Sequence, residues 1–254
     1  MGQVIAIGNQ KGGVAKTTTC LSLGACLAEL RKSVLLVDLD PQANLTLSLG
    51  LQPSSLRRTV GDAILHNATL VSISRETDVM GLDIAPANTG LAAVDKVLYR
   101  CREYEVYLKE AVQQLDQHLY DYVLLDCPPS FGPLTLNALT ASELMIVPTQ
   151  AEYYAARTLQ NVFELVRLVR ERTNPQLRYR LLVTMFDRRN KICQTMLAQM
   201  RSAFSQALFA TVIEIDTKLR ESPVVGQPIT LYRPNTRGAQ QYRALAKELM
   251  RDER

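Results

Sequence analysis

Residues Lys11 to Thr18 have the types and spacing that a phosphate-binding loop needs. The segment reads Lys-Gly-Gly-Val-Ala-Lys-Thr-Thr and directly follows an apolar run that starts at Val4. Small residues let backbone N–H groups close around phosphate oxygens, Lys16 adds positive charge at the β- and γ-phosphates, and the Thr17 hydroxyl can bind Mg²⁺. The predicted nucleotide-binding residues here are Lys11, Gly12, Gly13, Val14, Ala15, Lys16, Thr17 and Thr18. A helix over residues 16–30 directs its N-terminal dipole at the same anion.

The loop departs from the common phosphate-loop pattern G-x-x-x-x-G-K-[ST] at both outer glycines. Gln10 occupies the first of these positions and Ala15 the last, while a second lysine, Lys11, precedes Lys16 by five residues. A glycine turn with two solvated lysines is the alternative, but the order of strand, glycine pair, Lys-Thr-Thr and helix favours phosphate binding. Because a positive φ would cost Ala about 1 kcal/mol or more relative to Gly, we expect an ordinary negative φ at Ala15.

Two further apolar runs end in aspartate. Residues 34–38 lead into Asp38-Leu39-Asp40-Pro41, and residues 122–126 lead into Asp126-Cys127-Pro128-Pro129. Each pattern is typical of a parallel strand that is covered on both faces and whose carboxyl end opens onto a ligand crevice. Either aspartate alone could cap a helix or begin a turn. With the loop, they predict a metal and phosphate site at one edge of a sheet.

Together these segments resemble the ParA/MinD family of deviant Walker A ATPases, and within it the Soj-like branch of partition ATPases. The resemblance extends to residues 134–139, 147–154, 182–187 and 237–239, and so covers nearly the whole chain. It implies a Mg²⁺-dependent ATPase that is active as an ATP-dependent homodimer, binds non-specific DNA and hydrolyses ATP slowly until a ParB-like activator accelerates it. The cargo of such a protein is a chromosome, a plasmid or another large assembly.

The chemistry of ATP hydrolysis suggests roles for the charged residues. An in-line water must attack while positive charge stabilises the phosphate oxygens. We expect Lys16 and Thr17-bound Mg²⁺ to supply that charge, with Asp126 in the metal shell through water and Asp38 supporting the site. Asp40 is the candidate for positioning and polarising the water. The family resemblance implies that Lys11 reaches across the dimer interface to the phosphates of the other subunit.

The composition fits one cytoplasmic domain. A chain of 254 residues with 47% hydrophobic content can form one core, and it contains no linker rich in Gly, Ser or Pro. The five cysteines are widely spaced and include no C-x-x-C pair, which disfavours disulfides, a zinc site or an iron–sulfur cluster. No apolar run approaches the roughly 20 residues that cross a bilayer, so we expect a cytoplasmic, nucleoid-associated protein without a membrane partner.

The periodicity of the sequence predicts an α/β fold. Short apolar runs predict strands at residues 3–8, 33–38, 82–86, 120–126, 143–148, 179–185 and 209–213. Residues 153–172 have apolar positions at helical spacing and predict an amphipathic helix packed on the sheet. Alternating strands and helices indicate a mainly parallel, twisted sheet with helices on both faces, the fold of P-loop NTPases.

Basic charge is concentrated in the last 104 residues. Residues 1–150 have a net charge of −4 and residues 151–254 a net charge of +8, which together give the +4 of the chain. This asymmetry favours a DNA-binding face that contacts phosphates without base specificity. For any single arginine, a role in solvating a helix is equally plausible. The candidate DNA contacts are Arg188, Arg189, Lys191, Lys218, Arg220, Arg233 and Arg237.

One segment departs from the family. Soj-like proteins usually carry Ile-Pro-Arg-Asn-Val-Arg-Leu where residues 213–219 read Ile-Glu-Ile-Asp-Thr-Lys-Leu. Ile215 therefore replaces an arginine that the family uses on DNA, although Lys218 keeps a positive charge nearby. Asp216 replaces the asparagine beside the adenine, and its carboxylate can still accept a hydrogen bond from the adenine amino group.

The alternative function is that of a MinD-like positioning ATPase that acts through a membrane or a protein cargo. That branch typically ends in a short amphipathic helix with bulky apolar residues and lysines. The tail of this chain, residues 242–254, has an apolar stripe suited to docking on the sheet and ends in mixed charge. We therefore expect DNA, and not a membrane, as the partner.

Overall fold

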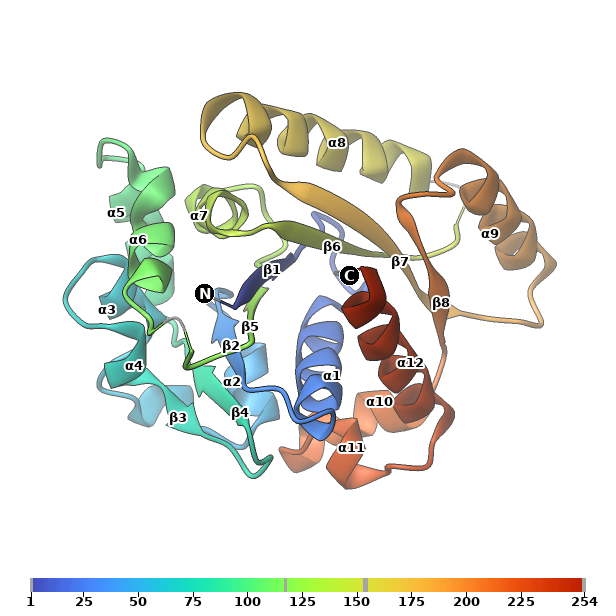
Figure 1. The fold of residues 1–254 in the computed structure, drawn as a ribbon, viewed down its shortest axis with the longest axis horizontal. Coiled ribbons are helices and arrows are strands. Elements are labelled where there is room, and N and C mark those ends of the chain that lie inside the picture. Colours follow the sequence, from blue (N-terminus) through green and yellow to red (C-terminus); the bar gives the residue numbers. More distant parts are fainter. Residues whose placement is uncertain (1, 117, 153–154, 253–254) are drawn as a thin grey trace.

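The centre of the computed structural model, which describes residues 2–116, 118–152 and 155–252, is one eight-stranded sheet (Figure 1). The strand order is β3-β4-β2-β5-β1-β6-β7-β8, and every neighbouring pair is parallel except β3 and β4. The strands are β1 (Gln3–Ile7), β2 (Val34–Asp38), β3 (Arg75–Glu76), β4 (Leu82–Ala85), β5 (Tyr122–Asp126), β6 (Leu144–Thr149), β7 (Arg178–Phe186) and β8 (Leu208–Glu214). All seven predicted strands are confirmed, and the two-residue edge strand β3 was not predicted.

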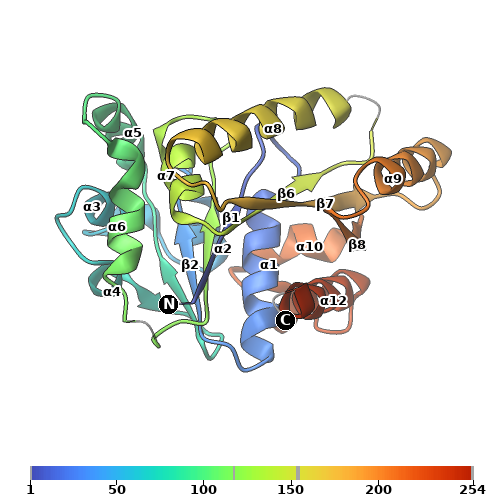
Figure 2. The ribbon, with the colours of Figure 1, turned by 45° about the horizontal axis from the view of Figure 1, so that its top comes forward.

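Helices cover both faces of the sheet, as the alternation of strands and helices predicts (Figures 1 and 2). One face carries α3 (Val60–Ile64), α4 (Leu70–Ile73), α5 (Leu91–Leu98), α6 (Tyr107–Gln113), α7 (Pro133–Ala141), α8 (Ala155–Arg172) and α9 (Lys191–Ala203). The other carries α1 (Lys16–Glu29), α2 (Asn44–Ser48), α10 (Thr217–Glu221), α11 (Ile229–Tyr232) and α12 (Arg237–Asp252). Short 3₁₀ helices lie at η1 (Pro53–Ser55), η2 (Tyr104–Val106) and η3 (Ser222–Val225).

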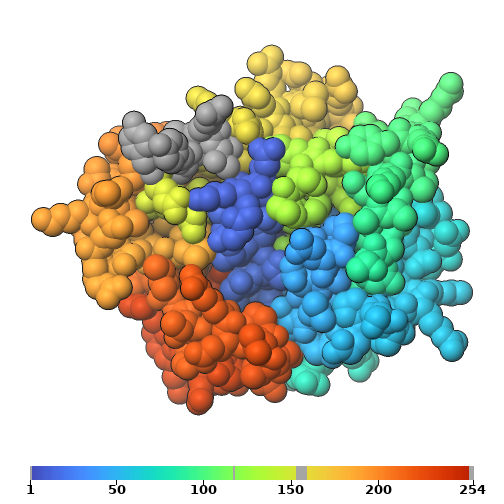
Figure 3. Space-filling model, turned by 180° about the vertical axis from the view of Figure 1, so that it is seen from behind, coloured from blue at the N-terminus to red at the C-terminus, as the bar shows by residue number. Residues whose placement is uncertain are grey.

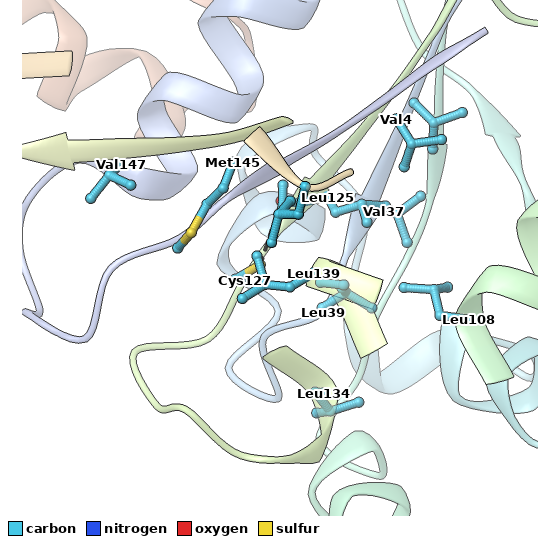
Figure 4. Close-up of a cluster of buried hydrophobic side chains, with 14 of the residues drawn as sticks. Val4, Val37, Leu39, Leu108, Leu125, Cys127, Leu134, Leu139, Met145 and Val147 are labelled. Carbon is cyan, nitrogen blue, oxygen red and sulfur yellow. Dashed lines mark hydrogen bonds between the residues drawn. The ribbon is translucent and has the colours of Figure 1, made fainter. Parts of the chain in front are cut away.

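The alternation of side chains along the central strands builds two apolar cores. In β2, Leu35 and Val37 join the core under α7 and α8, whereas Val34 and Leu36 join the core under α1 and α12. Figure 4 shows part of the first core, which contains Val4, Val37 and Leu125 of the strands and Leu134 and Leu139 of α7. Each fully buried Val or Leu side chain contributes about 1.5–3 kcal/mol, so the four apolar residues of β2 anchor the sheet.

Two amphipathic helices close the cores as expected. In α8, Leu159, Val162, Val166 and Val169 are buried, and the first two residues of the predicted 153–172 helix lie outside the described residues. In α12, the stripe of Tyr242, Leu245 and Leu249 is buried in the core that α1 also lines, which confirms that the tail docks on the fold. None of the helices in the described part of the chain combines the length and apolar character that a membrane crossing needs.

Strand order brings the predicted site residues to one edge. Strand β5 lies between β1 and β2, so that Asp126 is the register partner of both Ile7 and Asp38. Because these strands are parallel, their carboxyl ends open on the same side of the sheet. The phosphate loop after β1 therefore lies beside the loops that follow β2 and β5, as the blue, light-blue and lime segments at the centre of Figure 3 show.

Candidate nucleotide-binding site

The loop between β1 and α1 turns twice through the left-handed region. Gly13 has a φ of 71°, and Ala15, the N-cap of α1, has a φ of 65° and a ψ of 36°. The expectation of a negative φ at Ala15 was therefore wrong. The reason is that alternating left- and right-handed residues make a concave nest of backbone N–H groups, which a negative φ at Ala15 would open. A Cβ added at Gly12 would have no atom within 4 Å, so the loop is open toward solvent there.

Lys16 lies almost buried in this loop. Its side chain is 8% exposed, and its Nζ donates to the Lys11 carbonyl at 3.3 Å. Burial lowers the pKa of Lys16, although the carboxylates of Asp126 and Asp40 and the Cys127 thiol oppose that effect. A lysine held so close to its own loop has little conformational entropy left to lose when phosphate binds.

Asp126 is a buried acid at the carboxyl end of β5. It is fully buried, and neither carboxylate oxygen has a hydrogen-bond partner among the described residues. Burial, and then the Asp38 carboxylate, raises the pKa of Asp126 well above its usual range, whereas the nearby Thr17 hydroxyl and Lys16 lower it. Leaving such a group unsatisfied is costly, and a cation held between Asp126 and Thr17 would satisfy it. The residues present therefore fit Mg²⁺.

Asp38 has its hydrogen bonds within the protein. Its Oδ2 accepts from the backbone N–H and the hydroxyl of Thr46, at 2.9 and 2.7 Å, and its Oδ1 accepts from the Asp40 N–H at 3.1 Å. Burial raises the pKa of Asp38 to about 6, against the effect of these bonds. Asp38 is thus better placed to fix the loop after β2 than to ligate a metal. Thr46, which the sequence did not single out, also accepts from the Ala87 N–H at 2.9 Å.

Asp40 lies at the mouth of the site. Its side chain is 8% exposed, and its Oδ1 accepts from the Gln42 N–H at 2.9 Å. The backbone N–H of Asp40 is held by Asp38, so the position of this residue is set from within the protein. Within the described part of the chain no group donates a hydrogen bond to its second carboxylate oxygen, which can accept from a water molecule.

Lys11 points away from the phosphate loop in this structure. Its Nζ contacts Gln150 Oε1 at 2.6 Å and Glu152 Oε2 at 2.7 Å, both just after β6. Gln150 in turn donates from Nε2 to the Met185 sulfur at 3.2 Å. No pattern in the sequence indicates a role for Gln150 or Glu152, because these partners are about 140 residues from Lys11 and only the fold brings them together.

A cavity of about 230 Å³ opens beside the phosphate loop. It is lined by residues of that loop, of the ends of β7 and β8, and of α12, namely Gly13, Ala15, Thr18, Met185, Ile213, Glu214, Ile215, Asp216, Leu219, Arg220 and Tyr242. Small and apolar residues form most of this lining. A cavity of this kind next to a phosphate loop can hold the base of a nucleotide.

Asp216 lies in the wall of that cavity. It caps α10, accepting from the Lys218 N–H through Oδ1 and from the Gly238 N–H through Oδ2, each at 2.9 Å. Each carboxylate oxygen keeps a further lone pair, so Asp216 can still accept from an amino group in the cavity.

Comparisons with known proteins agree with this geometry. A family model described as an AAA domain matches residues 2–179. The chain is 44% identical to the sporulation initiation inhibitor protein Soj of Bacillus subtilis, over 98% of each chain. It is 37% identical to the chromosome partitioning protein ParA of Caulobacter vibrioides, over 99% of this chain and 95% of that one. The chain belongs to the ParA/MinD family of partition ATPases.

A solved structure supports the same assignment of the ParA/MinD fold. It is described as cobyrinic acid a,c-diamide synthase from Mycobacterium smegmatis with a bound ATP analogue and magnesium. The two chains superimpose with a TM-score of 0.87 at 36% identity, over 100% of this chain and 96% of that one. The P-loop NTPase fold predicted from the sequence is therefore confirmed.

Four of the seven predicted DNA contacts of this ParA/MinD chain are paired with acids. Arg188 and Arg237 both contact Glu214, Arg189 contacts Asp187, and Lys218 contacts Glu221. Within the described residues, Lys191, Arg220 and Arg233 have no ion pair, and Arg233 lies over the Tyr232 ring at 5.4 Å. The positive charge of the seven predicted DNA contacts, here called the basic rim, is therefore partly neutralised. Of these seven, Arg220 lines the cavity, and Arg188 and Arg237 contact its wall residue Glu214.

Proposed function

We propose that this chain is a partition ATPase that uses Mg²⁺-ATP to switch between a monomer and a DNA-binding homodimer. The observation that carries the proposal is the unpartnered, buried carboxylate of Asp126 beneath the left-handed phosphate loop. The mycobacterial structure is named as a diamide synthase, but the relative from Caulobacter vibrioides, at 37% identity, is named as a chromosome partitioning protein. We further propose that residues 1–254 act as one domain.

The phosphate loop, Thr17 and Asp126 would hold the nucleotide and its metal. Bound Mg²⁺ supplies charge that neutralises the phosphate oxygens, with the Thr17 hydroxyl as a ligand and Asp126 acting through water. Lys16 is already positioned by burial, so that it can place its ammonium group on the β- and γ-phosphates. The base would lie in the cavity, where Asp216 can accept from an adenine amino group but would face the carbonyl of guanine.

Two residues would make hydrolysis depend on assembly. Asp40, held in place through its backbone, would orient and polarise the attacking water. Lys11 would leave Gln150 and Glu152 and reach the phosphates of the partner subunit, where its charge stabilises the transition state. A monomer lacks that second lysine, and therefore hydrolyses ATP slowly.

The basic rim would bind the DNA of the nucleoid through its phosphates, and a ParB-like protein would stimulate hydrolysis to release it. The charge of +8 in residues 151–254 supports this part of the proposal. A membrane partner is not proposed, because the apolar stripe of α12 is packed into the core.

Binding to non-specific DNA, measured with ATP, with ADP and without nucleotide across a salt series, tests the proposal. We expect binding with ATP only, and a steep loss of affinity as the salt concentration rises. A lack of DNA binding in all three states would contradict the proposed function and favour a switch that acts on a protein or membrane partner.

A further inference from the structure

Glu214, the last residue of β8, joins two arginines that are far apart in the chain. Its carboxylate contacts Nη2 of Arg188 through Oε1, and Nη1 of Arg237 at 3.0 Å through Oε2. Arg188 follows β7, and Arg237 is the first residue of α12. Glu214 is only 5% exposed, so its charge is removed from water and directed at these two side chains.

Gln241 fixes the carboxylate from a third side. Its Nε2 donates to Glu214 Oε1 at 3.0 Å, and its Oε1 accepts from the Glu214 N–H at 2.9 Å. Two bonds to one glutamine leave the Glu214 side chain little freedom to turn. The carboxylate is therefore a fixed support, and not a mobile surface acid.

The two guanidinium groups are exposed although their support is buried. The side chains of Arg188 and Arg237 are 69% and 54% exposed. Each guanidinium has five N–H donors, of which Glu214 uses few, and Arg237 gives one more to the Ile215 carbonyl at 3.0 Å. The remaining donors face solvent. Two arginines beside a single carboxylate also carry a net charge of one positive unit.

The pair lies on the rim of the nucleotide face. Glu214, Ile215 and Asp216 form part of the wall of the base cavity, and Asp216 also holds the start of α12 through the Gly238 N–H. Figure 3 shows the orange segment after β7 next to the red-orange segment after β8, on the same face as the blue phosphate loop. Glu214, which holds the arginine pair, is thus also part of the wall of the cavity.

From this geometry we propose that Glu214 is a positioning residue, which holds Arg188 and Arg237 as one binding site for a phosphate group of DNA. The inference rests on the proposed function and deepens it. A fork of guanidinium donors matches phosphate oxygens, and a fixed pair loses less side-chain entropy on binding than two independent arginines. The open position of the pair suits a phosphodiester of a long polyanion.

The test measures DNA affinity and its salt dependence for chains saturated with a non-hydrolysable ATP analogue. We expect the double variant Arg188→Ala/Arg237→Ala to bind about tenfold more weakly and to lower the salt slope by about two. The control Arg75→Ala/Arg167→Ala removes the same charge from other exposed positions and should leave the slope nearly unchanged. The variant Arg188→Lys/Arg237→Lys keeps the charge without the fork, and we expect a weakening of about threefold or more.

Glu214→Gln separates positioning from simple charge. Removing a carboxylate adds one positive unit to the rim, so charge alone predicts tighter binding to DNA. Positioning predicts weaker binding and a salt slope reduced by about one, because the arginines no longer share a fixed support. Both arginines are exposed and can turn into solvent, so we expect this variant to fold, as a thermal unfolding curve would verify.

The outcomes distinguish the inference from the function on which it rests. If the wild-type chain binds DNA and the double alanine variant binds equally well, the arginine pair is not the site. Tighter DNA binding by Glu214→Gln would also overturn the positioning role. If the wild-type chain binds no DNA in any nucleotide state, the proposed function fails, and the inference fails with it.

Discussion

The phosphate end of the site and the basic rim hold their charges in opposite ways. At the phosphate end, Lys16, Asp38, Asp40 and Asp126 are at most 8% exposed. On the rim, the basic side chains are largely exposed, and four of the seven have an acidic partner. Burial fixes the first group at a cost in desolvation, which hydrogen bonds within the protein offset for Asp38 but not for Asp126. Charges of the second group are solvated whether or not a ligand is bound.

Single substitutions should therefore have larger effects at the phosphate end than on the basic rim. An exposed ion pair is worth about 0–1 kcal/mol, so one arginine of the rim can be lost with little effect. A buried charge that acts on a phosphate has no substitute. If one rim substitution changed function as strongly as a substitution at the phosphate end, this comparison would be wrong.

The largest expected effect is that of Lys11→Ala on turnover. A charge supplied across a subunit interface is worth about 10³-fold or more in phosphoryl transfer. Since Lys11 contacts Gln150 and Glu152 and not the phosphate loop, nucleotide binding should persist. Steady-state ATPase assays and nucleotide titrations measure both quantities. Lys32→Ala, which breaks an exposed pair with Asp121, is the control. Turnover at the wild-type rate would reject the role of Lys11.

Asp40→Ala should reduce turnover by about 10²–10⁴-fold, the range for losing a group that activates water. ATP affinity should change little, because Thr46 still holds Asp38 and the loop after β2. The measurement is single-turnover hydrolysis under saturating ATP. Asp78→Ala, at an exposed position, is the matched control. If the Asp40 variant hydrolysed ATP normally, another group would have to activate the water.

Asp38 should make the stability of the nucleotide-free chain depend on pH. Burial raises its pKa to about 6 in the folded state, compared with about 3.9 in the unfolded chain. Between pH 4 and pH 6 the folded state binds a proton at Asp38 that the unfolded chain does not bind. The loss of stability from burying the charged carboxylate is therefore complete above pH 6 and disappears as the pH falls toward 4. The difference is of the order of 2–3 kcal/mol.

Urea unfolding of the wild type and of Asp38→Asn measures this penalty. Asparagine resembles the protonated side chain. The free energy of unfolding of the variant minus that of the wild type should therefore be larger at about pH 7.5 than at about pH 4.5. A difference between the two chains that did not change with pH would contradict the assignment.

The smallest expected effect is that of Ala15→Gly. Relief of the positive φ should outweigh the added backbone entropy of glycine, and raise the free energy of unfolding by roughly 0.5–1 kcal/mol. In contrast, Ala92→Gly, in the exposed part of α5, should lower that free energy by about 1 kcal/mol. Thermal or urea unfolding of both variants measures the two changes in the free energy of unfolding. A destabilised Ala15 variant would show that its methyl group packs usefully.

The sequence was sufficient for the strands, for the helices on both faces and for the meeting of the phosphate-site segments. Apolar runs report burial directly, and parallel strands that end in Asp38 and Asp126 can meet only at a shared edge. Phosphate binding uses backbone and adjacent residues, so its signal is local. The packing of α12 was predictable for the same reason, since its apolar stripe has a regular period.

The conformation of Ala15 and the partners of the exposed charges could not be predicted. An alanine has a negative φ unless the surrounding loop requires otherwise, and that requirement comes from the nest of N–H groups as a whole. Lys11 and Glu152, or Arg188 and Glu214, meet only after the sheet has formed. The sequence showed that positive charge gathers in residues 151–254, but not which acid faces each arginine.

The most direct test of the account is the mass of the Asp40→Ala chain in solution, measured by light scattering with Mg²⁺-ATP and with Mg²⁺-ADP. The account predicts a dimer, at about twice the chain mass of 28.4 kDa, with ATP and a monomer with ADP. A chain that stayed monomeric with ATP, or that was dimeric with both nucleotides, would contradict the claim that the phosphate end is an ATP-dependent dimerisation switch.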